Sequence, residues 1–280
     1  MPSTPSTKSA AAASAVVPSK SKPSQPQTSQ PPPSNDANKP QEPLLHPVQL
    51  KQTPLSRTAR HALPALQAAL FAARFRSLVA DPVAEMTLLL PATAALQVAY
   101  ALVCLPVAGE NTTTTAAGGG SEGGVKKTAG GKRKAGSGAA GGGVGTKGVT
   151  TAILSLLLSF LVTPFLYLTM VLFGAPFLTH NAHTLLCAAH AAVLALFPVF
   201  FVRGVDGTAW ASLGGFSAPL DETYGGLVGA AAGAWLGAVP IPLDWDREWQ
   251  KWPVTILCGL YAGHLVGRVL GGTVAWGKRF

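Results

Sequence analysis

Charged residues are scarce in this sequence: they make up 12% of its 280 residues, whereas a soluble domain carries about a quarter. The shortage is greatest in several long apolar stretches, which hold almost no Asp, Glu, Lys or Arg. Hydrophobic residues reach 48%, and the mean hydropathy is +0.32. This composition argues against an ordinary soluble domain and favours an integral membrane protein.

Cysteine is also rare, and its spacing excludes two kinds of site. The three cysteines, Cys104, Cys187 and Cys258, all lie in apolar stretches and form no CxxC pair. A disulfide framework or a zinc site would need closer or paired spacing. We therefore expect them to be small buried apolar side chains.

The motifs of common catalytic centres are missing as well. The sequence has no HExxH and no nucleophile elbow, and its 31 glycines never precede Lys-Ser or Lys-Thr in Walker spacing. No basic region followed by an apolar stretch and a small-residue cleavage site opens the chain, so we expect no cleaved signal peptide. We expect no catalytic residue, no metal site and no cofactor.

Six apolar stretches predict an all-α, polytopic membrane protein of about six transmembrane helices, since about 20 apolar residues span a bilayer. They cover Ala62–Ala80, Val83–Val107, Thr151–Ala175, Ala182–Val202, Tyr224–Ile241 and Trp252–Thr273. The first is the least certain, because Arg74 and Arg76 each cost about 2.5–3.5 kcal/mol near a bilayer centre. If this first stretch does not cross the membrane, five spans remain.

Two segments of low complexity separate these helices into groups. We expect a disordered, basic Pro/Ser-rich tail over residues 1–60 and a flexible Gly/Lys-rich loop over 108–150. Helices one and two then occupy 61–107, helices three to six occupy 151–275, and 276–280 form a short tail.

The basic residues predict the orientation of the chain. A net charge of +9 could suggest nucleic acid, but most Lys and Arg lie in the segments between apolar stretches. With both termini cytosolic, the expected lumenal turns hold only Arg247 and Lys251, as the positive-inside rule requires. The sequon at Asn111 would then be cytosolic and unmodified.

Glycine recurs every four residues in the fifth and sixth expected spans. The two ladders comprise Gly225, Gly229, Gly233 and Gly237, and Gly259, Gly263, Gly267 and Gly271. Residues four apart share one helix face, and glycine lets two helix backbones approach closely. Either the two spans pack as a tight hairpin, or one ladder receives a helix from another subunit.

The turn between these spans is rich in aromatic and charged residues. Its signature residues are Pro242, Asp244, Trp245, Asp246, Arg247, Trp249 and Trp252. Tryptophan is enriched at membrane interfaces. The turn is therefore either an interfacial belt with local ion pairs, or a site where the carboxylates hold a divalent cation or Arg247 holds a phosphate.

Three ionisable residues are candidates for lipid contact. His183 lies at the start of the fourth span, and His264 and Arg268 form a polar stripe in the sixth. Ionisable residues inside a membrane are functional candidates. Helix capping or interhelical hydrogen bonding is the alternative for His183, and a carbonyl or a lipid phosphate could partner the other two.

Several of these segments resemble the PIG-F family of GPI-anchor biosynthesis proteins. The resemblance covers about residues 60–275, apart from the Gly-rich insert, and is carried by FGAP at Phe173–Pro176, by His183-Thr184, and by GAWLGAVPIPLDWDREWQKWP at Gly233–Pro253. It implies a multi-pass protein of the endoplasmic reticulum. It also implies a non-catalytic, stabilising partner of the transferases that add ethanolamine phosphate to mannoses of the GPI precursor.

The resemblance leaves two further functions to test. The chain could instead move a membrane lipid such as phosphatidylethanolamine, with His183, His264 and Arg268 lining the path. It could also be a membrane transferase in its own right, which would need a carboxylate or histidine whose loss abolishes turnover.

Overall fold

The computed structural model describes residues 45–109 and 143–280, and no strand occurs in either range. Eight α-helices, with a π-helical and a 3₁₀ segment, make up the described chain. In order they are α1 (Pro54–Ala80), α2 (Pro82–Cys104), α3 (Gly143–Leu172), α4 (Asn181–Ala191), η3 (Ala192–Leu196), α5 (Phe197–Arg203), α6 (Gly207–Gly214), α7 (Glu222–Ala238), η4 (Glu248–Gln250) and α8 (Val254–Gly272). The all-α prediction is confirmed.

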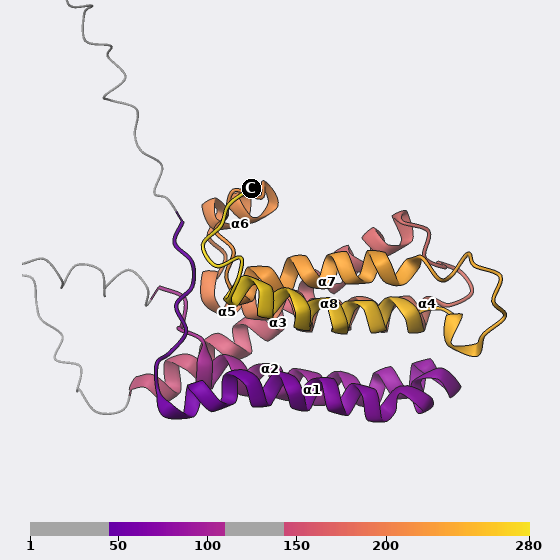
Figure 1. Ribbon diagram of the computed structural model, residues 1–280, viewed down its shortest axis with the longest axis horizontal. Coiled ribbons are helices and arrows are strands. Elements are labelled where there is room, and N and C mark those ends of the chain that lie inside the picture. Colours follow the sequence, from indigo (N-terminus) through magenta and orange to yellow (C-terminus); the bar gives the residue numbers. More distant parts are fainter. Residues whose placement is uncertain (1–44, 110–142) are drawn as a thin grey trace, which may run out of the picture. The chain divides into compact units, whose positions relative to one another are not determined.

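Proline and short polar side chains fix where the first two helices begin. Thr53 caps α1, with its hydroxyl 3.1 Å from the backbone nitrogen of Ser56, and Asp81 caps α2, with its carboxylate 3.1 Å from that of Ala84. In each case proline follows as the first helical residue, where its missing N–H costs nothing. Asp81 therefore ends one helix and begins the next, which makes α1 and α2 an antiparallel pair (Figure 1).

Four of the helical segments are long and apolar enough to cross a membrane. They are Pro82–Cys104, Gly145–Leu172, Asn181–Arg203 and Val254–Gly272, and they match four of the six expected spans. The other two expected spans are helical but do not qualify. α1 carries four arginines, and α7 has only 17 residues.

Two of the expected boundaries differ from the structure. α3 begins at Gly143, so the flexible loop expected to reach residue 150 ends earlier, because extending a helix from a strongly apolar segment costs little. The tail expected to reach residue 60 is ordered from residue 45, since Val48 is buried and α1 starts at Pro54. The remainder of both segments lies outside the described residues.

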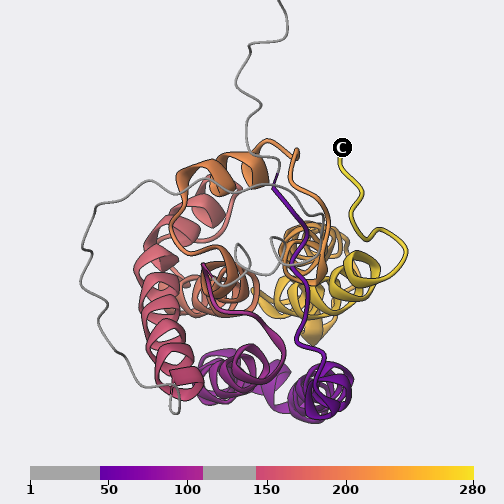
Figure 2. The same ribbon diagram turned by 90° about the vertical axis from the view of Figure 1, so that its left-hand side faces the viewer.

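The segment α4–η3–α5 lies at the centre of the helices, and α3 lies at their edge. In the most apolar window of Asn181–Arg203, 89% of residues are buried, against 22% for α3. Figure 2, which looks along the helices, shows α1 with α2, α3, and α7 with α8 on different sides. α3 therefore exposes a long apolar face, which suits contact with lipid. The exposed residues of this face include Ile153, Leu157, Leu161, Phe165 and Leu168.

The three cysteines are free thiols, as expected. Cys104 and Cys187 are buried, and Cys258 is half-buried. Cys104 and Cys187 are thus the small buried apolar side chains that were expected, whereas Cys258 is partly exposed.

Candidate functional site

The two glycine ladders pack directly against each other. A Cβ atom added to Gly229 would lie 2.7 Å from the Cα of Gly267, and one added to Gly233 would lie 2.8 Å from the Cα of Gly263. Real Cβ atoms do not approach so closely, so only glycine permits this spacing of the backbones. The same holds along both ladders, at Gly225, Gly229, Gly233, Gly237, Gly259, Gly263, Gly267 and Gly271. The glycine face of α7 is thus covered by α8, and that of α8 by α7. The alternative in which one ladder receives a helix of another subunit does not fit this packing.

This close packing fixes the register of α7 on α8 and brings a buried carboxylate beside a buried arginine. Glu222, in the first turn of α7, is 6% exposed, and its Oε2 lies 3.5 Å from a terminal nitrogen of Arg268. Gly225 lies against Gly267 and Gly271 one turn further along. The ladder therefore determines which residue Arg268 meets.

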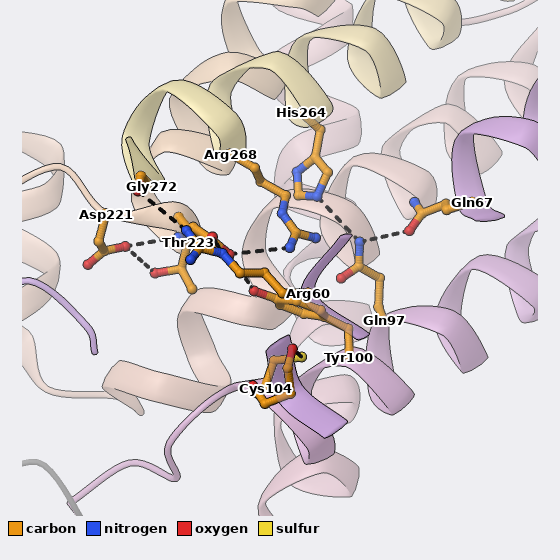
Figure 3. Close-up of polar contacts among 12 residues, drawn as sticks. Arg60, Gln67, Gln97, Tyr100, Cys104, Asp221, Thr223, His264, Arg268 and Gly272 are labelled. Atoms are coloured by element: carbon orange, nitrogen blue, oxygen red, sulfur yellow. Dashed lines mark hydrogen bonds and ion pairs between the residues drawn. The ribbon is translucent and has the colours of Figure 1, made fainter. Parts of the chain in front are cut away.

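Two more helices contribute a residue each to this site, Tyr100 and Arg60, which lie beside Arg268 in Figure 3. Tyr100 of α2 donates a 2.7 Å hydrogen bond to Glu222 Oε2, and its ring lies 4.0 Å below the guanidinium carbon of Arg268. Arg60 of α1 donates to Glu222 Oε1 and to the carbonyl oxygen of Gly272 at 3.3 Å. One carboxylate thus joins α1, α2, α7 and α8, and we call Arg60, Tyr100, Glu222 and Arg268 the Glu222 cluster.

A chain of uncharged polar groups extends from the Glu222 cluster along α8. His264 lies 3.3 Å through Nδ1 from the carbonyl oxygen of Gly226, and its Nε2 lies 3.4 Å from the amide nitrogen of Gln97. The Gln97 amide also donates to Gln67 Oε1 at 3.2 Å. Gln97 is 1% exposed, and its Oε1 has no hydrogen-bond partner in the described part of the chain. α1, α2, α7 and α8 are again joined.

Asp221 precedes the cluster and fixes the entry into α7. Its fully buried carboxylate accepts from the backbone nitrogens of Thr223 at 2.9 Å and Tyr224 at 3.0 Å, which caps the helix. It also accepts from the backbone nitrogen of Val48 at 2.9 Å and from Arg203 at 3.1 Å. One side chain therefore holds the start of α7, the end of α5 and the segment before α1 together.

The charged side chains that lie between the helices form ion pairs with one another. Burying an unpaired charge is costly, and a pair is tolerated only with good geometry and further hydrogen bonds. Glu222 meets Arg60 and Arg268, Asp221 meets Arg203, and Arg74 of α1 makes two hydrogen bonds of 2.7 and 2.8 Å to Glu85 of α2. The last pair explains how α1 carries Arg74, which had counted against its crossing a membrane.

The three expected lipid-contact residues are not brought together. His264 and Arg268 are buried within the network just described. His183 is half-buried at the start of α4, where its ring lies 5.0 Å from that of His180. The neighbouring Thr184 accepts from Trp252 at 3.1 Å, just before α8 begins, whereas Arg268 lies near the end of that helix. A path lined by all three residues is therefore not formed.

The expected signature turn is exposed, and a glutamine holds it together. Residues 241–248 are all exposed, and Gln250 accepts from the backbone nitrogen of Arg247 at 2.9 Å and donates to the carbonyl oxygens of Pro240 and Leu243. The local ion pairs expected here reduce to one, Lys251 with Glu248 at 3.1 Å.

The charged side chains of the signature residues have no polar partner within the described chain. Asp244, Asp246 and Arg247 form no side-chain hydrogen bond or ion pair there. Trp245 and Trp249 lie with ring centroids 5.9 Å apart, and Trp245 is 53% exposed. No group of three His, Cys, Asp or Glu suited to a metal occurs among the described residues, here or elsewhere.

Comparison with known proteins agrees with the family resemblance found in the sequence. Residues 62–272 match the model of the GPI biosynthesis protein family Pig-F. The chain is 57% identical over 236 residues to glycosylphosphatidylinositol anchor biosynthesis protein 11 of Neurospora crassa, covering 84% of this chain and 82% of that protein. The protein of the same name from Aspergillus fumigatus is 48% identical over 259 residues, with 86% and 85% covered.

A more distant relative carries a second protein. The PIGF/3-ketodihydrosphingosine reductase fusion protein of Schizosaccharomyces pombe is 35% identical over 124 residues, which are 42% of this chain and 22% of the fusion. No solved structure gives a significant match.

Proposed function

Because the chain belongs to the Pig-F family of GPI biosynthesis proteins, we propose that it is the non-catalytic, stabilising subunit of a GPI ethanolamine-phosphate transferase complex. The complex acts in the endoplasmic reticulum membrane on mannoses of the GPI precursor. The chain crosses that membrane six times, with α1 and α7 as the two further spans, and both termini are cytosolic.

The buried ionisable groups support a stabilising role. Glu222 is engaged by Arg60, Arg268 and Tyr100, and Asp221 by Arg203 and by the backbone of α7. Each of these side chains joins helices of this chain. Such a network holds the helices of this chain in one arrangement. A catalytic subunit bound to them would then be supported by a rigid partner.

The observation that carries the proposal is the exposed turn between α7 and α8. Asp244, Asp246 and Arg247 project charge of both signs beside the exposed Trp245, and none of these three charged side chains has a hydrogen bond or ion pair in the described chain. Tryptophan and arginine are common anchors of protein interfaces. We assign this turn to the contact with the lumenal domain of the catalytic subunit.

Co-purification tests the proposal. The tagged chain is extracted in mild detergent, and the proteins that accompany it are identified; a large phosphotransferase is expected. The triple change Asp244→Ala, Arg247→Ala and Trp245→Ala should remove it while the chain itself stays folded, because these side chains are exposed. Arg76→Ala, at an exposed position of α1, is the matched control and should leave the complex intact.

The outcome that contradicts the proposal is equally clear. If the wild-type chain is recovered folded, monodisperse and without any transferase, it is not a stable subunit of such a complex. If the transferase is recovered with the triple variant at the wild-type level, the complex stands and the assignment of the turn is wrong.

A further inference from the structure

Two adjoining hollows run along the outer side of α8. One, of about 480 Å³, lies between α1 and α8, with Phe71, Ala68 and Leu265 among its mostly apolar walls. The other, of about 290 Å³, extends to Pro240 and Trp249. Phe75 and Cys258 line both. The hollows therefore meet at these two residues and form one groove, which we call the α1–α8 groove.

The two ends of this groove differ in character. At the inner end, Gln67 and His264 border it, and both are fixed by their bonds to Gln97. At the outer end, Trp249 stands beside Pro240, whose carbonyl oxygen accepts from Gln250. The groove thus begins beside the turn of residues 240–253, and its far end is bordered by polar groups.

The length and the mostly apolar walls of the groove suit a hydrocarbon chain. Its larger hollow follows α1 from Pro64 to Phe75, which is about 16 Å at the rise of an α-helix, or roughly half of the hydrocarbon core of a bilayer. A single acyl chain reaching from the surface of one leaflet toward the mid-plane fits this length and these apolar walls.

The turn at the outer end offers charges that complement a phospholipid headgroup. The carboxylates of Asp244 and Asp246 could pair with an amine, and the guanidinium of Arg247 with a phosphate. All three side chains are exposed and unpaired within the described residues. Trp249 supplies the aromatic ring that is typical of the membrane interface.

We propose that the α1–α8 groove holds one acyl chain of a phospholipid whose headgroup carries both an amine and a phosphate, taken from the leaflet on the side of the 240–253 turn. The headgroup lies against Asp244, Asp246 and Arg247. The chain passes Trp249, Phe75 and Cys258 and reaches Gln67 and His264. This is a lipid-binding site of the chain itself and does not depend on a partner protein.

Photo-crosslinking of the purified full-length chain tests the site. The chain is placed in phosphatidylcholine vesicles with a small share of phosphatidylethanolamine that carries a diazirine in its acyl chain, and labelled peptides are mapped. Labelling should concentrate on the groove walls around Phe71, Phe75 and Cys258. Equal labelling of the exposed face of α3, at Leu161 and Phe165, would show general lipid contact and overturn the proposal.

A pair of adjacent residues supplies the matched variants. Ala68 lines the groove, whereas Ala69 is exposed and lines neither hollow. Ala68→Trp should fill the groove and abolish the concentrated labelling, and Ala69→Trp should retain it. If Ala68→Trp is not recovered folded, Ala72→Trp and its neighbour Ala73→Trp repeat the comparison. Unchanged labelling in a folded groove-filling variant overturns the proposal.

Competition between headgroups tests the outer end. Unlabelled phosphatidylethanolamine should displace the probe at a lower share of the vesicle lipid than phosphatidylglycerol, which lacks the amine. The combined changes Asp244→Asn and Asp246→Asn should remove that difference. Equal competition by both lipids in the wild-type chain would overturn the headgroup assignment. Because no transferase is present, these results are separate from co-purification.

Discussion

The hydroxyl of Tyr100 lies 2.7 Å from Glu222 Oε2, so that α2 is bonded to the first turn of α7, 122 residues away in the sequence. The same ring lies under the guanidinium of Arg268. Tyr100 therefore contacts both members of the buried ion pair, and the pair is held in place from two helices at once.

Removing this hydroxyl should lower stability without changing the packing of the ring. In Tyr100→Phe, Glu222 loses one hydrogen bond to a charged group, which contributes about 1.5–3 kcal/mol. Thermal unfolding of the chain in mild detergent, followed by size-exclusion chromatography of heated samples, should show a lower midpoint. Tyr167→Phe on α3, a residue with no side-chain hydrogen bond in the described chain, should leave the midpoint unchanged. An equal effect of both changes would mean that the Tyr100 bond contributes nothing.

Neutralising Glu222 should cost more than removing Tyr100. Glu222→Gln leaves Arg60 and Arg268 near each other without a counter-charge, and breaking a buried pair costs about 3–5 kcal/mol. Adding Arg268→Met should recover part of that loss, because one uncompensated charge is removed. A double-mutant cycle on the unfolding midpoint measures the coupling. Strictly additive effects would show that the two side chains do not interact.

The glycine ladder predicts a contrast between two glycine-to-alanine changes. In Gly229→Ala the new Cβ meets the backbone of Gly263 and Gly267, whereas nothing lies within 4 Å of one added to Gly145. Overpacking costs about 1–3 kcal/mol, so Gly229→Ala should unfold earlier in the same assay, and Gly145→Ala should be neutral or slightly more stable. A neutral Gly229→Ala would mean that α7 and α8 are further apart than the structure shows.

This contrast also bears on any experiment with a partner. Bulky residues in either ladder would separate α7 from α8 and displace Glu222 from Arg268. Loss of a partner from such a variant would therefore reflect a damaged chain, whereas the exposed turn can be changed without that effect.

Much of the fold could be predicted from local sequence. Long apolar stretches ended by charged or Pro-containing turns, such as Asp81-Pro82, locate the helices. The start of α3 was missed because glycine and threonine at residues 143–151 read as a loop, although a helix already formed by apolar residues extends through them at little cost.

The buried network was only half predictable. His264 and Arg268 stood out because ionisable residues are rare in apolar stretches. Their partners did not. Glu222 lies 46 residues from Arg268 and 162 from Arg60 in the sequence, and it meets Arg268 only because the glycine ladders set the register of α7 on α8. One local signal was available: Asp221-Glu222 directly before an apolar stretch is typical of a helix cap followed by an acidic first turn.

The shortness of α7 makes its crossing of the membrane the sharpest test of the proposed topology. Its 17 residues extend about 25 Å, slightly less than the roughly 30 Å of a hydrocarbon core. If α7 crosses, exposed positions on its two sides face different compartments. We expect Val205→Cys, exposed before α6, to react with a membrane-impermeant maleimide in sealed, right-side-out microsomes. Asp244→Cys should react only after permeabilisation.

The native thiols should add little maleimide labelling of their own, because Cys104 and Cys187 are buried. The half-buried thiol is removed by Cys258→Ser. Reaction of both introduced cysteines in sealed vesicles would place the two turns on one side. α7 would then not cross the membrane, and the Asp244 turn could not meet a lumenal domain. Reaction of Asp244→Cys alone would show the opposite orientation, in which the same turn is cytosolic. Only protection of Asp244→Cys with reaction of Val205→Cys fits a chain whose glycine-packed α7 crosses the bilayer and presents its charged turn to the lumen.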